Sequence, residues 1–210
     1  MTRLVLIRHG ESWASVDRVV IGHGCRGLTP RGRRQAEALR DRLTRTRDLA
    51  EATALYASLM RRSAETAEII TPAVGDGGLE LRVDCGVCEI HGGEGEGLSW
   101  DEWEARYGGL DLGLDRDRPR APGAESVDEF VGRVDAALTR LAADHYGETV
   151  VVACHGGVVA SALEALVGIR YATATRYVEN TAITEFERDE DGRWWLVRLN
   201  DAAHLGVLEA

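Results

Sequence analysis

The chain has 210 residues, of which 44% are hydrophobic and 29% are charged, a balance typical of a soluble globular protein. The length suits one full-sized domain and no linker interrupts it, so we expect residues 1–210 to form a single domain. The formal net charge of −10 argues against a broad binding surface for nucleic acid or for a membrane.

The first predicted elements alternate between strand and helix. The nearly continuous apolar run Thr2–Ile7 is typical of a buried strand. Thr29 followed by Pro30 is the pattern of an N-cap and a first helical residue, so a helix is expected to begin there. Further patterns predict strands at 54–57 and 79–83, with a helix at 63–70 between them.

In the second half, two capping boxes predict helix starts at Ser99 and Ser126. Residues 98–125 include a polar, proline-containing segment, and we expect them to form a cap-like surface excursion over a cleft. The remaining patterns predict a buried strand at 149–154, a helix after it, and a terminal hairpin of strands 182–187 and 194–199. This alternation indicates an α/β fold with a largely parallel sheet.

Two of these strands deliver the same pair of residues at their carboxyl ends. His9 and Gly10 follow the first strand, and His155 and Gly156 follow the strand at 149–154. Carboxyl ends of parallel strands line the crevice in which ligands bind, so two neighbouring strands would direct both imidazoles at one point. A histidine after a buried strand can also be a hydrogen-bonded structural residue. The pattern alone leaves both interpretations open.

The basic residues and the cysteines narrow the ligand classes. All 25 basic residues are arginine, whose planar, permanently charged fork matches phosphate, so a small anionic substrate is compatible with the acidic chain. Cys85 and Cys88 form a Cys-x-x-Cys pair, but no second pair exists, and we expect ordinary thiols rather than a metal or redox site.

With no transmembrane-length run and no signal peptide pattern, we expect a cytoplasmic protein.

The segment Arg8–Ser12 (RHGES) resembles the histidine phosphatase superfamily, the phosphoglycerate-mutase-like enzymes. Other segments are similar to motifs of that family, in the family's order and over most of residues 3–160. These segments are Leu28–Ala36, Ser58–Ala67, Glu89–Gly97, Pro122–Ser126 and His155–Gly157. The resemblance implies a three-layer α/β/α fold of the phosphoglycerate-mutase type.

The resemblance also implies a role for each matched residue. His9 would attack phosphorus, Glu89 would act as general acid and base, and Arg8, Arg62 and His155 would bind the phosphoryl oxygens. A neutral imidazole is a competent nucleophile near pH 7, and guanidinium groups clamp phosphate oxygens with charge-assisted bonds. Because these groups neutralise the transferring phosphoryl group, neither a metal nor a cofactor is expected.

The chain departs from the family pattern at two places. An asparagine that commonly contacts phosphate shortly after the first motif is missing, and Ser15 is the candidate for a replacement contact. Gly95 stands where the family has a tryptophan, which is expected to remove a large wall beside the acid. Because of these departures, the substrate of no single subfamily can be assigned to this chain.

The resemblance favours a phosphomonoesterase that hydrolyses a small phosphorylated metabolite, because Glu89 is followed by Ile90, as in the broad-specificity phosphatases. A mutase-type phosphotransferase would need extra cationic anchors. Arg116, Arg118 and Arg120 alternate with aspartates and are expected to be solvated instead. A non-catalytic phosphate-binding or protein-interaction module is the third alternative. The sequence does not specify the substrate, and it leaves a homo-oligomer open.

Overall fold

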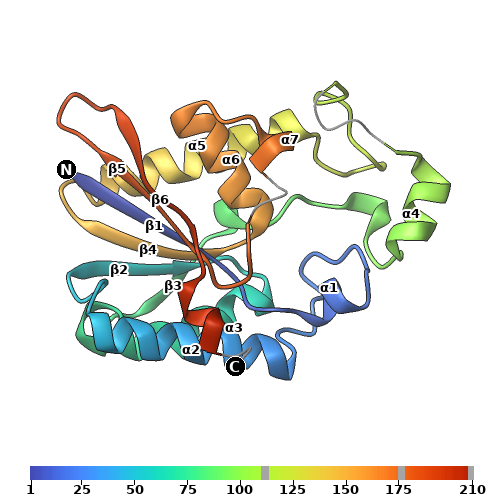
Figure 1. Cartoon of the computed structure of the whole chain (residues 1–210). Coiled ribbons are helices and arrows are strands. Elements are labelled where there is room, and N and C mark those ends of the chain that lie inside the picture. Colours follow the sequence, from blue (N-terminus) through green and yellow to red (C-terminus); the bar gives the residue numbers. More distant parts are fainter. Residues whose placement is uncertain (110–113, 175–177, 208–210) are drawn as a thin grey trace.

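The structure, a computed structural model, describes residues 1–109, 114–174 and 178–207. Its centre is a six-stranded sheet in the order β3-β2-β4-β1-β5-β6 (Figure 1). The strands are β1 (Thr2–Arg8), β2 (Ala52–Ala57), β3 (Leu81–Val83), β4 (Thr149–Cys154), β5 (Ile183–Arg188) and β6 (Trp194–Asp201). The pairs β3-β2, β2-β4 and β4-β1 are parallel, whereas β5 pairs antiparallel with β1 and with β6. The mostly parallel sheet and the terminal hairpin are therefore confirmed.

Helices cover both faces of this sheet. Helices α2 and α3 lie on one face, and α5 and α6 lie on the other, which gives the three-layer α/β/α arrangement (Figure 1). The α-helices are α1 (Trp13–Val16), α2 (Pro30–Thr46), α3 (Arg61–Ile70), α4 (Trp100–Tyr107), α5 (Val127–Asp144), α6 (Gly156–Val167) and α7 (Tyr171–Ala174). Short 3₁₀ turns are η1 (Thr71–Ala73), η2 (Gly75–Gly77), η3 (Cys85–Val87), η4 (Gly93–Gly95) and η5 (Ala203–Val207).

Successive side chains of β1 point to opposite faces of the sheet, and helices cover both of these faces. Leu4 and Leu6 pack into the cluster under α5 and α6, whereas Val5 and Ile7 pack into the cluster under α2. All four side chains are fully buried, so the strand is apolar throughout instead of alternating with polar residues. Burial of this apolar surface on both sides is the main stabilising term of the sheet.

The predicted helix starts are confirmed by their caps. The Thr29 hydroxyl accepts a hydrogen bond from the Gly32 amide at 3.0 Å, and complete capping boxes are present at Ser99 and Ser126. Two four-residue helices, α1 and α7, were not predicted, because four residues are too few to show a hydrophobic period.

The predicted excursion extends the molecule beyond one end of the sheet. Helix α4 lies there, on the same side as α1 (Figure 1), and residues 110–113 of the excursion lie outside the described residues. Within the described parts of the chain, none of the helices combines the length and the apolar character that crossing a membrane requires.

Candidate active site

The carboxyl ends of β1 and β4 lie side by side. Arg8 is in register with Cys154, and the His9 amide donates a hydrogen bond to the Cys154 carbonyl at 3.0 Å. This parallel pairing brings His9 and His155 together, with their ring centroids 5.1 Å apart. The two strands that end in His-Gly are therefore neighbours, and their imidazoles meet at one edge of the sheet.

The His9 ring is held in a defined tautomer. Its Nδ1 donates to the Gly10 carbonyl at 2.7 Å, so Nε2 carries the free lone pair and accepts from Arg62 Nε at 3.1 Å. Burial, followed by the positive charges of Arg62 and Arg8, holds the pKa of His9 well below its usual value. The imidazole is therefore neutral at pH 7, and its nitrogen is available for bond formation.

The two arginines reach the histidines from different elements. Arg8 ends β1, and its Nη1 donates to the Val178 carbonyl. Arg62 comes from the first turn of α3, is 5% exposed, and donates from Nη1 to the Ile21 carbonyl at 3.3 Å. The preceding residue, Arg61, is exposed and pairs with Glu65, so Arg62 is the member of the pair that faces the histidines.

Glu89 follows the Cys85–Val87 turn, and two backbone amides hold its carboxylate. Gly157 donates to Oε2 and Ile90 donates to Oε1, both at 3.1 Å. A Cβ atom at position 157 would lie 2.1 Å from Oε1, so the close approach of the carboxylate requires glycine there. Gly157, in the first turn of α6, thus makes room for the Glu89 carboxylate and donates a hydrogen bond to it.

These side chains surround one pocket of about 500 Å³. Of the six predicted site residues, five line it: Arg8, His9, Ser15, Arg62 and Glu89. The sixth, His155, is fully buried beside His9 and bonds through Nε2 to the Ser58 hydroxyl at 2.6 Å. Burial, with the charge of Arg62 next, also lowers the pKa of His155 well below its usual value.

The two departures from the family pattern have visible consequences. Ser15 is exposed on α1 at the pocket, with its hydroxyl 3.1 Å from that of Ser12. Beside Gly95, the indole of Trp103 fills the space, because a Cβ at Gly95 would lie 2.9 Å from its Nε1. The expectation of a missing wall was therefore wrong. A tryptophan from another element stands against Gly95 and lines the pocket.

The outer part of the pocket was largely missed by sequence reasoning. Arg120 is half-buried, with its guanidinium carbon 4.6 Å from the ring centroid of Trp103, and Arg118 lines the pocket although it is exposed. Arg116 forms ion pairs with Asp128 and Glu164. The expectation that all three arginines are merely solvated was wrong. Apolar and aromatic side chains make up much of the remaining lining, among them Val19, Val20, Ile21, Ile90, Trp100, Val127 and Tyr171.

Asn180 is a further residue that no sequence pattern indicated. Its side-chain Nδ2 donates to the His9 carbonyl at 2.9 Å and so fixes the backbone from which the imidazole projects. Asn180 lies in the segment before β5, which pairs antiparallel with β1. Only knowledge of this pairing would have placed the segment beside His9.

The His9 imidazole, two guanidiniums and the Glu89 carboxylate line one pocket, and the His155 imidazole lies against His9. This arrangement is suited to a tetrahedral oxyanion such as a phosphoryl group. The chain belongs to the histidine phosphatase superfamily (branch 1), whose family profile matches residues 4–202. This membership agrees with the resemblance seen in the sequence motifs.

Individual relatives span nearly the whole chain. Phosphoglycerate mutase-like protein 4 of Arabidopsis thaliana is 33% identical, over 96% of this chain and 86% of the relative. The metal-independent phosphoserine phosphatase of the same plant is 28% identical, over 98% and 84%. Among solved structures, Bacillus stearothermophilus YhfR superposes with a TM-score of 0.82 at 29% identity, covering 98% of this chain and all of that one (100%). Membership and relatives together support a phosphatase activity.

Proposed function

We propose that the protein is a metal-independent phosphomonoesterase that hydrolyses a small phosphorylated metabolite through a phosphohistidine on His9. The observation that carries this proposal is the neutral Nε2 of His9, which faces the pocket and lies 3.1 Å from the guanidinium of Arg62. A nucleophile and a cationic clamp thus meet at one point. A 28% identical relative is named a metal-independent phosphoserine phosphatase, which supports the same chemistry.

In the first step, Nε2 of His9 attacks phosphorus in line with the ester oxygen. The new P–N bond forms as the P–O bond to the leaving group breaks, and negative charge spreads over the three equatorial oxygens. Arg62 exchanges its bond to Nε2 for one to these oxygens, while Arg8 and His155 contact the same group. Fixed donors of this kind typically contribute about 10²–10³ in rate each.

Glu89 serves both halves of the reaction. It enters the first step protonated and transfers its proton to the leaving alkoxide as the ester bond breaks. In the second step, the resulting carboxylate removes a proton from water, whose oxygen attacks the phosphohistidine and breaks the P–N bond. Phosphate leaves, and His9 is neutral again. The amides of Gly157 and Ile90 keep the carboxyl aimed at the pocket.

The lining of the pocket suggests a class of substrate. Its volume of about 500 Å³ suits a small metabolite. The apolar and aromatic side chains of the lining favour an organic part with an apolar surface, and Arg118 and Arg120 can contact a second anionic group on it. A phosphomonoester that combines these features is the expected substrate.

The same two arginines favour a second candidate, a mutase-type phosphotransferase. Such an enzyme must retain the dephosphorylated molecule so that the phosphoryl group returns to another hydroxyl instead of to water. Arg118 and Arg120 line the pocket and could anchor that molecule. Similarity to a phosphoglycerate mutase-like protein is compatible with this alternative.

The decisive experiment measures hydrolysis of p-nitrophenyl phosphate with EDTA present, for the wild type, His9→Ala and His145→Ala. His145 lies away from the pocket lining and bonds to Tyr56, so its variant is the matched control. We expect turnover in EDTA for the wild type and the control, and loss of about 10⁴-fold or more for His9→Ala. Unchanged turnover in His9→Ala would refute the proposal.

A trapping experiment tests the intermediate itself. p-Nitrophenol leaves without a proton, so Glu89→Gln should still be phosphorylated by this substrate but should release the phosphoryl group slowly. Intact-protein mass spectrometry should then show one acid-labile phosphoryl group, absent from the double variant with His9→Ala. Phosphoryl exchange between phosphoglycerates without phosphate release would instead establish the mutase.

A further inference from the structure

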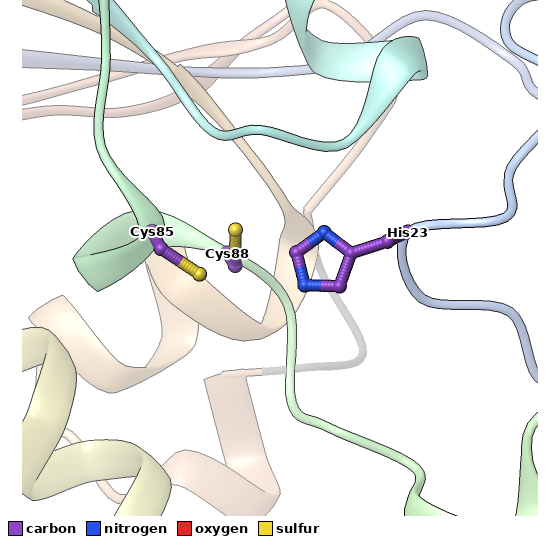
Figure 2. Close-up of side chains that lie close together, drawn as sticks. All are labelled: His23, Cys85 and Cys88. Atoms are coloured by element: carbon purple, nitrogen blue, oxygen red, sulfur yellow. The ribbon is translucent and has the colours of Figure 1, made fainter.

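Three metal-binding side chains converge beside the pocket. His23, Cys85 and Cys88 each offer one ligand atom, and these atoms lie within 4.8 Å of one another. Figure 2 shows the imidazole of His23 directed at the two thiols from a separate loop. His23 is exposed, whereas Cys88 is fully buried, so the group extends from the surface inward.

The spacing is close to that of a tetrahedral zinc site. With Zn–S bonds of about 2.3 Å and Zn–N bonds of about 2.0–2.1 Å, ligand atoms lie roughly 3.5–3.8 Å apart, so no pair needs to close by more than about 1.3 Å. The exposed His23 side chain can make such an adjustment by rotation. Thiolate and imidazole are the ligand types that zinc prefers over harder cations.

The turn that carries the two cysteines is fixed before any ligand binds. Asp84 accepts a hydrogen bond from the Gly86 amide at 2.8 Å. Arg133 donates from Nη1 to the carbonyls of Cys85, Gly86 and Cys88 at 3.1, 3.0 and 3.1 Å. The guanidinium therefore holds the turn and places a positive charge near two groups that bind metal as thiolates.

The histidine distinguishes a metal site from a redox pair. A disulfide between Cys85 and Cys88 would need no third group, whereas a metal requires further ligands. The His91 ring lies 6.0 Å from the His23 ring, and its Nε2 is buried without a hydrogen-bond partner within the described part of the chain. His91 or a water molecule can therefore complete the coordination.

We infer that His23, Cys85 and Cys88 bind a thiophilic divalent cation, Zn²⁺, at a site separate from the chemistry. The ion would connect two segments that frame the pocket. His23 lies two residues after Ile21, whose carbonyl accepts from Arg62 at 3.3 Å, and Cys88 directly precedes Glu89. Zinc thus holds together the loop of His23, which lies beside Arg62, and the turn of Cys85 and Cys88, which precedes Glu89. The ion takes no part in phosphoryl transfer.

The test measures metal binding without substrate. Reduced, metal-free protein is titrated with Zn²⁺, and with Co²⁺ to record the thiolate-to-metal absorption band. We expect one tightly bound ion in the wild type. Affinity should fall more than about 100-fold in His23→Ala, Cys85→Ser and Cys88→Ser, because loss of even an outer-shell partner costs about 10–100-fold. His145→Ala should bind as the wild type does.

His23→Cys tests the role of the side chain as a ligand, because a third thiolate should restore tight binding. Zinc should also raise the thermal unfolding midpoint of the wild type but not of His23→Ala, whose exposed side chain is not needed for folding. Equal affinity in the wild type and His23→Ala would overturn the site. So would a reduced wild type that binds no ion. None of these readouts depends on phosphatase activity.

Discussion

The pocket has two parts that are built in different ways, a floor and a wall. The floor is formed by Arg8, His9 and Arg62, and the fully buried His155 packs against His9. The wall is formed by residues of the excursion, namely Trp100, Trp103, Arg118 and Arg120. Backbone pairing between β1 and β4 and direct side-chain hydrogen bonds fix the floor. The wall rests on ring contacts, such as the Trp100–Trp103 pair with centroids 5.2 Å apart.

This difference separates the residues that act in the catalytic step from those that select the substrate. A change in the floor must disturb paired strands or buried charges, whereas a change in the wall can alter the pocket without reaching the sheet. We therefore expect floor variants to lose kcat and wall variants to change KM, because wall contacts hold the substrate equally in the ground and transition states. The predictions below test that division.

Among the variants that test this division, Arg62→Met is expected to have the largest effect, because it nearly keeps the length of the side chain but removes the charge. Arg62 donates a hydrogen bond to Nε2 of His9, the proposed nucleophile, and is 5% exposed. The loss should therefore appear in kcat as about 10²–10³-fold, or roughly 3–4 kcal/mol. Steady-state kinetics with p-nitrophenyl phosphate measure it.

The adjacent Arg61→Met is the matched control, because it removes the same charge from an exposed position. Arg61 is exposed, and its buried partner Glu65 keeps its contacts with Arg33 and with the Leu28 amide when Arg61 is replaced. Its kcat should stay within about twofold of the wild type. Similar losses in both variants would show that general positive charge matters at the floor and that the position of Arg62 does not.

The floor could be predicted from sequence to a much greater extent than the wall. His9 and His155 each follow a buried apolar strand, and Arg62 was assigned through the resemblance of Ser58–Ala67 to a motif of the family. Local sequence patterns of this type are sufficient to predict where a side chain lies. The pairing of β1 with β4 was a hypothesis that the parallel register confirmed.

The wall depends on where a long segment folds back, and local patterns do not contain that information. Trp103 was readable only as part of a helix, and its contact with Gly95 is tertiary. Arg120 alternates with acidic residues, which is also the pattern of a solvated loop, yet it stacks on Trp103. The contact of His23 with Cys85 and Cys88 is also tertiary, because His23 comes from another loop. The Cys-x-x-Cys pair alone therefore gave no indication of a third ligand.

A smaller effect is expected from Arg120→Met in the wall. Arg120 lines the pocket and lies over Trp103, so removal of its charge should raise KM about tenfold for a substrate with a second anionic group. The value of kcat should change little. Arg106→Met is the control, because Arg106 is exposed on α4, lies over Tyr107 and is not part of the pocket lining. A loss of kcat comparable to that of Arg62→Met would contradict the division between floor and wall.

The smallest effect concerns stability. The pH dependence of the free energy of unfolding should change in a floor variant but not in a wall variant. Burial and the neighbouring arginines hold the pKa of His9 below its usual value, so the unfolded chain binds protons more readily than the folded one. The resulting stability is fully present above the unfolded pKa of about 6.5 and is lost as pH falls below it. The loss reaches at most about 1.4 kcal/mol per pH unit for each such histidine.

Urea unfolding between pH 7 and pH 5 measures this dependence. His9→Asn removes one of the two depressed histidines of the floor, so its free energy of unfolding should fall less steeply with acid than that of the wild type. Arg120→Met, a change in the wall, should keep the wild-type slope. Groups away from the floor titrate alike in all three proteins, so the difference between slopes reports on His9 and on its effect on the pKa of the neighbouring His155. Equal slopes in the wild type and His9→Asn would mean that His9 titrates normally and is not held neutral by the floor.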